Sequence, residues 1–122
     1  MALAKDIMGG GFSAGQAQAI QGAINSAVTA AGTVITDATD LVASNNYIST
    51  AAASSGVQLP SVPLGDSLCV YNGGANAVKV YPHSSTGTIN AGSAGAAVTC
   101  PVNTLMTFRR WTTTKWVAML SA

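Results

Sequence analysis

The stretch "DSLCVYNGGANAVKVYP", from Asp66 to Pro82, indicates the fold class most clearly. Apolar and polar residues alternate on both sides of its centre, which is the period of a half-buried β-strand. The central Asn72-Gly73-Gly74 supplies residues that tolerate the positive φ of a tight turn. The stretch therefore predicts two neighbouring strands joined by a hairpin.

Short apolar or alternating runs continue to the C-terminus, among them "GTIN", "AAVTC", "TLMTFRRW" and "KWVAMLS". Gly, Pro, Asn and Ser separate them at the spacing of an all-β sandwich or barrel. We therefore expect a mainly β domain, a small antiparallel, jelly-roll-like β-sandwich or barrel, in which "WTTTK" links the last two strands. The apolar positions of these runs predict the core: Leu68, Val70, Val78, Val80, Ile89, Val98, Met106, Phe108, Trp116 and Ala118.

The preceding segment, residues 13–56, has a weaker pattern. We expect one short helix at about residues 14–21, with Ser13 as its N-cap, and extended segments after it. Apolar residues at helical spacing also allow a single helix that continues to Ala31. Gly22 and the weak helix formers after it argue against that longer helix. For residues 22–31 the sequence leaves helix and strand both open.

Residues 1–12 are expected to form an N-terminal arm, and residues 13–122 a single β-rich domain. Leu3, Ile7 and Met8 fall on one side of a helical turn, and three glycines separate them from Phe12. An arm of this length cannot bury these side chains within itself. We therefore predict that Leu3, Ile7, Met8 and Phe12 contact a partner.

The stretch from Gly11 to Gly15 matches the G-x-S-x-G motif of α/β-hydrolases, and Asp66 and His83 follow Ser13 in the order that those enzymes use. No strand-like run precedes Ser13, although the motif requires one. A chain of 122 residues also has too little room for the strand–helix crossovers of that fold. We therefore interpret His83 as a solvated loop residue and predict no catalytic residue.

The composition argues against several other classes. Only 7% of the residues are charged, and without a basic stripe we expect no nucleic-acid binding. A single histidine and two cysteines without zinc spacing predict neither a metal site nor a cofactor. The sequence has no apolar run of about 20 residues, so we expect no membrane association. It shows no signal peptide, so Cys69 and Cys100 are expected to stay free thiols in a reducing cytoplasm.

Three further stretches carry a resemblance to a known group of proteins. They are "AQAIQGAINSAVTAAGT", "GVQLPSVPLGDSLCVYNGGANAVKVYP", and "TIN" with the closing "F…W" hairpin. From about Ala17 to its end the chain resembles small virion structural proteins of tailed bacteriophages, the head decoration or cement proteins and related fibre modules. The resemblance implies a β-rich, oligomeric, non-enzymatic protein and carries over no catalytic residue.

The resemblance also implies a function and a location. The expected function is to bind the outer surface of a phage capsid and stabilise it, after assembly in the cytoplasm of the bacterial host. The expected partners are the major capsid protein and further copies of the chain, with a trimer favoured over a dimer. The formal net charge of +1 gives little repulsion between copies. The alternative is a head or tail fibre, spike or baseplate module that binds glycan, for which Trp111, Trp116 and Tyr81 would form the aromatic cluster.

Overall fold

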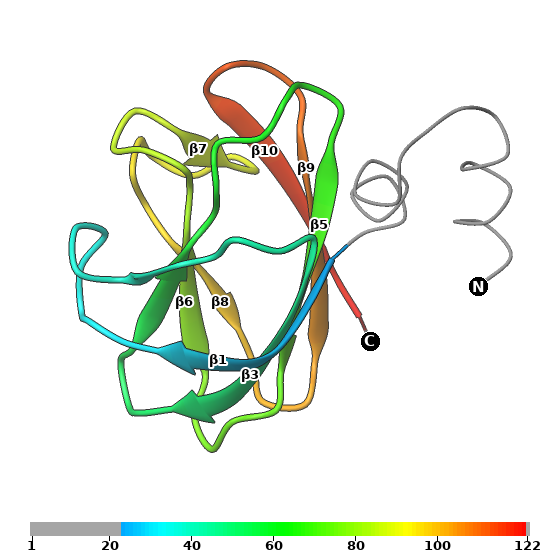
Figure 1. Cartoon of the computed structure of the whole chain (residues 1–122). Coiled ribbons are helices and arrows are strands. Elements are labelled where there is room, and N and C mark those ends of the chain that lie inside the picture. The colour runs from blue at the N-terminus through cyan, green and yellow to red at the C-terminus, as the bar shows by residue number, and fades with distance from the viewer. Residues whose placement is uncertain (1–22, 122) are drawn as a thin grey trace, which may run out of the picture.

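The computed structural model describes residues 23–121, and its regular structure consists of β-strands (Figure 1). No helix occurs among the described residues, and the prediction of a mainly β chain is confirmed. The expected arm over residues 1–12 and the short helix over residues 14–21 lie outside this range. The strands are β1 (Ile24–Ala30), β2 (Thr39–Asp40), β3 (Asn45–Ala51), β4 (Gly56–Gln58), β5 (Ser67–Asn72), β6 (Val78–Tyr81), β7 (Thr88–Ile89), β8 (Val98–Cys100), β9 (Leu105–Arg110) and β10 (Lys115–Leu120).

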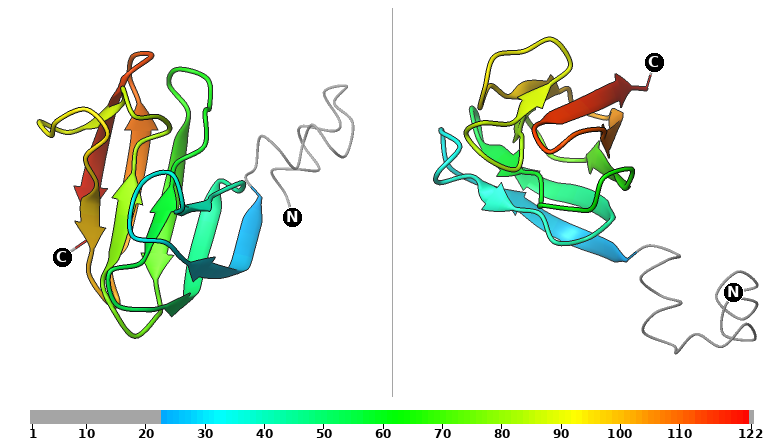
Figure 2. Two further views of the ribbon diagram at one scale, coloured as in Figure 1. Left: turned by 90° about the vertical axis from the view of Figure 1, so that its left-hand side faces the viewer. Right: turned by 90° about the horizontal axis from the view of Figure 1, so that it is seen from above.

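The strands form two sheets. Sheet A has the order β1-β3-β5-β9-β10-β7, and sheet B has the order β2-β4-β6-β8. Seen from the side, the N-terminal strands lie at one end of the stack and β10 lies towards the other (Figure 2). Residues 24–30 form β1, which excludes the longer helix to Ala31.

The first six strands wind from sheet to sheet. In sheet A, β1, β3 and β5 pair in parallel, and in sheet B, β2, β4 and β6 do the same. Each successive pair of strands therefore makes one rung, and three rungs stack like a short solenoid. The expectation of an antiparallel, jelly-roll-like sandwich or barrel is wrong for this half, because alternation reports which side chains are buried and not the direction of the neighbouring strand.

The C-terminal strands close this coil with antiparallel pairs. β9 pairs antiparallel with both β5 and β10, and β8 pairs antiparallel with β6. The hairpin predicted around "WTTTK" is confirmed, because β9 and β10 are direct neighbours in sheet A. β7 adds a short parallel pair at the other side of β10.

The hairpin predicted at Asn72-Gly73-Gly74 is wrong. β5 and β6, on either side of it, belong to different sheets and do not pair. Neither glycine has a positive φ. Both are needed for space instead, because a Cβ at Gly73 would collide with the Tyr47 ring, and one at Gly74 would lie 2.7 Å from the Ala51 Cβ.

Asn72 holds this turn together from inside the protein. Its side chain is fully buried, and its amide nitrogen donates to the carbonyls of Asn76, at 2.9 Å, and Cys100, at 3.0 Å. Its Oδ1 accepts from the Gly74 amide at 3.0 Å. Asn76 in turn donates to the Ala51 carbonyl at 2.9 Å. The turn thus connects the second and third rungs and β8 through buried polar contacts, which such groups require.

The core lies between the two sheets. Every predicted core residue is buried except Val98 and Ala118, which are half-buried and pack against the same cluster. The fully buried Phe108 and Trp116 are the largest side chains in it. The first two rungs add apolar residues that the sequence analysis did not assign to the core: Val28, Ala30, Leu41, Ile48, Ala51, Val57 and Leu59.

Candidate interaction surface

The residues predicted to contact a partner, Leu3, Ile7, Met8 and Phe12, lie outside the described residues 23–121, as does Ser13. The described part of the chain offers a different surface. It is the face of sheet A that points away from the core, formed by Tyr47, Tyr71, Leu105, Thr107, Arg109, Val117 and Met119, and it is called the outer face below.

Strand register places these side chains in rows across sheet A. One row runs from Cys69 on β5 through Thr107 to Met119 on β10. A second joins Tyr47, Tyr71 and Leu105. The alternate residues of β9, Met106 and Phe108, are buried beneath, so the outer face follows from the two-residue period of the strands.

The centre of the outer face is aromatic and aliphatic. The rings of Tyr47 and Tyr71 stack with their centroids 5.4 Å apart and their planes 22° apart. Tyr47 is 44% exposed, Leu105 38% and Met119 73%. These large side chains stand on strands that are hydrogen-bonded to neighbours, so the surface is both apolar and rigid.

Charge on this face is sparse and of one sign. The strands of sheet A contain no acidic residue. Arg109 is exposed on the outer face, and its guanidinium lies 5.9 Å from the centre of the Trp111 ring. This distance allows a cation–π attraction. The outer face therefore suits a neutral or weakly acidic, largely apolar partner surface.

His83 is not the solvated loop residue that the sequence predicted. It is half-buried, and its Nδ1 accepts a hydrogen bond from the Trp116 indole nitrogen at 2.9 Å. Because an indole N–H only donates, the neutral imidazole carries its proton on Nε2. That nitrogen lies 3.2 Å from Arg110 Nη2, a group that also only donates. Burial, and then the Arg110 charge, lower the pKa of His83 from its usual value.

Arg110 joins two loops at this end of the molecule by hydrogen bonds and lies beside a third. Its Nη1 donates to the Val62 carbonyl at 2.6 Å and to Ser61 Oγ at 3.2 Å, both in the β4–β5 loop. Its Nη2 donates to the Thr113 carbonyl at 2.7 Å, in the β9–β10 turn. These hydrogen bonds of Arg110, together with the one from Trp116 to His83 in the neighbouring β6–β7 loop, are called the clasp below. All of the hydrogen-bond acceptors in the clasp are neutral groups. The clasp contains no nucleophilic side chain in contact with a base.

Asp37 and Asp40 lie near each other in the sequence, just before and at the end of β2, and Asp37 has a structural role. Asp37 Oδ1 accepts from the Thr33 and Val34 amides at 3.0 and 2.9 Å, which closes the turn between β1 and β2. Asp40 ends β2. Within residues 23–121, no group of three or more His, Cys, Asp and Glu side chains could hold a metal ion.

The cysteines are free in the structure, as predicted. Cys100 is fully buried, and burial raises the pKa of its thiol. Cys69 lies on the outer side of β5, and its Sγ is 3.6 Å from Thr107 Oγ1. These positions make Cys69 the more accessible thiol.

The aromatic residues expected for glycan binding do not gather on the surface. Trp116 is fully buried and Tyr81 is 7% exposed. Of the three, Trp111 alone is exposed. The aromatic pair on the outer face is instead the exposed Tyr47 and the half-buried Tyr71. The sequence analysis missed it because only the pairing of β3 with β5 brings the two rings together.

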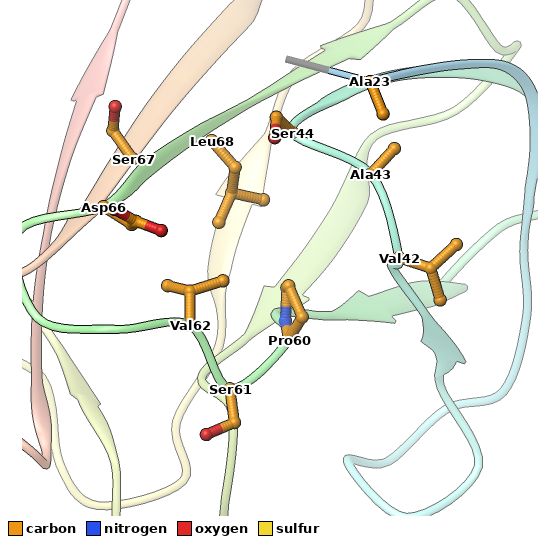
Figure 3. A pocket seen from close by; sticks show the side chains of 10 residues that line it. All are labelled: Ala23, Val42, Ala43, Ser44, Pro60, Ser61, Val62, Asp66, Ser67 and Leu68. Carbon is orange, nitrogen blue, oxygen red and sulfur yellow. The ribbon is translucent and has the colours of Figure 1, made fainter. Parts of the chain in front are cut away.

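A shallow hollow of about 370 Å³ lies beside the start of sheet A (Figure 3). Its walls come from the turns after β2 and β4, the start of β5, and Ala23, which directly precedes β1. Small and apolar side chains dominate them, and Asp66 is the one charged residue: the lining is Ala23, Val42, Ala43, Ser44, Pro60, Ser61, Val62, Asp66, Ser67 and Leu68.

Comparison with known proteins gives no matching family model, no similar curated protein and no similar solved structure. In the part of the chain that the structure describes, no helix has the length and hydropathy needed to cross a membrane.

Proposed function

We propose that this protein is a non-enzymatic structural protein of a tailed-bacteriophage virion, a decoration protein that binds the outer surface of the head and stabilises it. The resemblance of the sequence to small virion structural proteins of tailed bacteriophages supports this class of function. The main structural support is the outer face of sheet A, because this surface is rigid, exposed and nearly uncharged. Exposed apolar patches of this kind are typical of protein contact sites.

The chemistry of the outer face favours a protein partner. Complete burial of a fully exposed Leu or Met side chain contributes about 1.5–3 kcal/mol. Met119, 73% exposed, has most of that area left to bury, and Leu105, 38% exposed, has a smaller part. Because the strands beneath are already ordered, little conformational entropy is lost on binding. The stacked Tyr47 and Tyr71 add large contact area with few rotatable bonds, which is a property of residues that dominate interfaces.

In the proposed assembly the outer face contacts the major capsid protein, and the chain itself forms a homo-oligomer, a trimer in preference to a dimer. Residues 1–12, with Leu3, Ile7, Met8 and Phe12, provide a second contact to the shell. Several such contacts on one oligomer raise the effective concentration of the later ones, and avidity can then exceed a single affinity by about 10²–10⁴. The protein is assembled in the host cytoplasm and remains on the outside of the virion.

Co-sedimentation with undecorated capsids tests the role of the outer face. Met119→Asp places a charge at an outer-face position that is 73% exposed. Leu64→Asp is the matched control, because Leu64 is also an exposed apolar residue, 56% exposed, in the β4–β5 loop. We expect Met119→Asp to weaken capsid binding at least about tenfold, which corresponds to about 1.4 kcal/mol, and Leu64→Asp to bind like the wild type. Equal binding by all three proteins would remove the outer face from the proposal.

A further inference from the structure

His83 meets two hydrogen-bond donors, although its neutral ring can accept only one hydrogen bond. Its Nδ1 faces the Trp116 indole nitrogen at 2.9 Å, and its Nε2 lies 3.2 Å from Arg110 Nη2. Indole and guanidinium nitrogens only donate, and a neutral imidazole has a single acceptor nitrogen. Because Nδ1 accepts from Trp116, both Nε2 and Arg110 Nη2 carry protons, and neither can accept from the other. This contact lacks an acceptor.

Arg110 has more hydrogen-bond donors than the described chain gives it acceptors. A guanidinium carries five N–H groups. Three of them have a protein acceptor, since Nη1 donates to Ser61 and Val62, and Nη2 donates to Thr113. The second N–H of Nη2 is the one beside His83. The N–H of Nε is buried and has no hydrogen-bond partner within residues 23–121. Donors without an acceptor are unfavourable away from water, so this excess of donors calls for an added acceptor.

The positive charge of Arg110 also lacks a counter-ion among its hydrogen-bond partners. Those partners are two backbone carbonyls and the hydroxyl of Ser61, all of them neutral. The β9–β10 turn and the loops that lead into β5 and β7 lie at the same end of the molecule (Figure 1). Ser61 and Thr113 are exposed there, whereas Arg110 and His83 are half-buried. A group from outside can therefore approach the clasp at its border.

We propose that Arg110 Nη2 and His83 Nε2 together bind an oxygen of a carboxylate group. An oxygen placed between these nitrogens accepts from both, which removes the conflict between the two donors. A carboxylate carries one negative charge and matches the single charge of Arg110, whereas a phosphate group carries about −1.5 to −2. Hydrogen bonds from a guanidinium to a carboxylate are also stronger than those between neutral groups. The carboxylate belongs either to an Asp or Glu side chain of a protein partner or to a small free molecule.

Acetate is the probe for the carboxylate. It is titrated into the isotope-labelled full-length chain at about pH 7.5, where neutral imidazole predominates, with sodium chloride added to keep the ionic strength constant. We expect the NMR resonances of the His83 ring to shift and to saturate, with half-saturation on the order of 10 mM. Chloride alone should give no saturable shift. A His83 ring that does not respond to acetate would overturn the proposal.

Variants of the two arginines at the end of β9 assign the binding to the clasp. Arg110→Gln removes the charge and should weaken acetate binding at least about tenfold. Arg109→Gln is the matched control, because the neighbouring Arg109 is exposed and takes no part in the clasp, and it should bind acetate like the wild type. Arg110→Gln also loses contacts to two loops, so His83→Leu is a second variant, followed at the Arg110 Nε–H resonance, and should weaken binding as well.

Two further results would contradict this assignment. Equal acetate binding by Arg110→Gln and the wild type would place the site elsewhere. Inorganic phosphate that binds at least about tenfold more tightly than acetate would show that the site prefers a different anion.

Co-sedimentation with undecorated capsids distinguishes the two sources of the carboxylate. Release of the wild-type chain by saturating acetate, but not by sodium chloride at the same ionic strength, would assign the carboxylate to the capsid protein. Capsid binding that acetate leaves unchanged would assign it to a small free molecule. A chain that binds acetate but no capsid at all would contradict the proposed function and leave the carboxylate site intact.

Discussion

Trp116→Phe removes one hydrogen bond from the clasp while it keeps an aromatic ring in the core. Trp116 is fully buried, and its indole nitrogen donates to His83 Nδ1 at 2.9 Å. A net hydrogen bond contributes about 1 kcal/mol. The smaller ring also leaves a void equal to roughly two methylene groups, about 1–2 kcal/mol. We therefore expect the free energy of unfolding to fall by about 2–3 kcal/mol.

The same contact predicts how stability changes with pH. Protonation of His83 would place a proton on Nδ1, where the Trp116 N–H already points, and a positive charge beside Arg110. Burial and the Arg110 charge lower the pKa of His83 in the folded protein. The unfolded chain, with the ordinary value of 6.5, therefore takes up the proton first as pH falls. Neutral His83 therefore makes its full contribution to the free energy of unfolding above about pH 6.5. That contribution is lost as the pH falls toward the pKa of His83 in the folded protein.

Urea unfolding at a fixed protein concentration, at about pH 7.5 and about pH 5, measures both effects. His83→Gln is the control, since it removes the titrating group and should flatten the difference between the two pH values. Trp116→Phe should reduce that difference without removing it, because burial and Arg110 remain. A loss of under about 0.5 kcal/mol in Trp116→Phe would contradict the role of this hydrogen bond. The same pH dependence in the wild type and His83→Gln would contradict the role of His83.

Three further predictions concern the turn, the thiols and the assembly. Gly74→Ala should lower the free energy of unfolding by about 1–3 kcal/mol in a denaturant titration, because the new methyl group would lie 2.7 Å from the Ala51 Cβ; wild-type stability would show that the turn shifts freely. Under native conditions a thiol reagent should modify Cys69 well before the buried Cys100, and the denatured, unreduced chain should titrate two thiols; equal native rates would contradict the burial. Light scattering should give about three times the chain mass of 12.1 kDa, whereas a monomer at all concentrations would exclude the proposed trimer.

The sequence was most informative where side-chain chemistry and strand period agree. The alternation in β5, β6, β9 and β10 correctly assigned the inward residues, and Phe108 and Trp116 are indeed fully buried. The first two rungs were harder to predict because small residues such as Ala, Ser and Thr dilute the pattern. β1 illustrates this, since its sequence "INSAVTA" allowed both helix and strand.

Strand partners were not predictable from local patterns. The turn at Gly73 and Gly74 has the composition of a hairpin, but both glycines are needed for close packing against Tyr47 and Ala51. That requirement exists only after the rungs have stacked. The clasp escaped prediction for the same reason, because His83 meets Arg110 and Trp116 across 27 and 33 residues of chain. The stacked tyrosines likewise depend on the parallel register of β3 and β5.

A cryo-electron-microscopy reconstruction of phage capsids mixed with the full-length protein is the most direct test of the proposed function. We expect regularly spaced density on the outside of the shell, with the outer face of sheet A, including Tyr47 and Met119, turned towards the major capsid protein. Capsids that stay bare at saturating protein would contradict it. Density that contacts the shell only through sheet B, or that lies on the tail, would contradict the role assigned to this face.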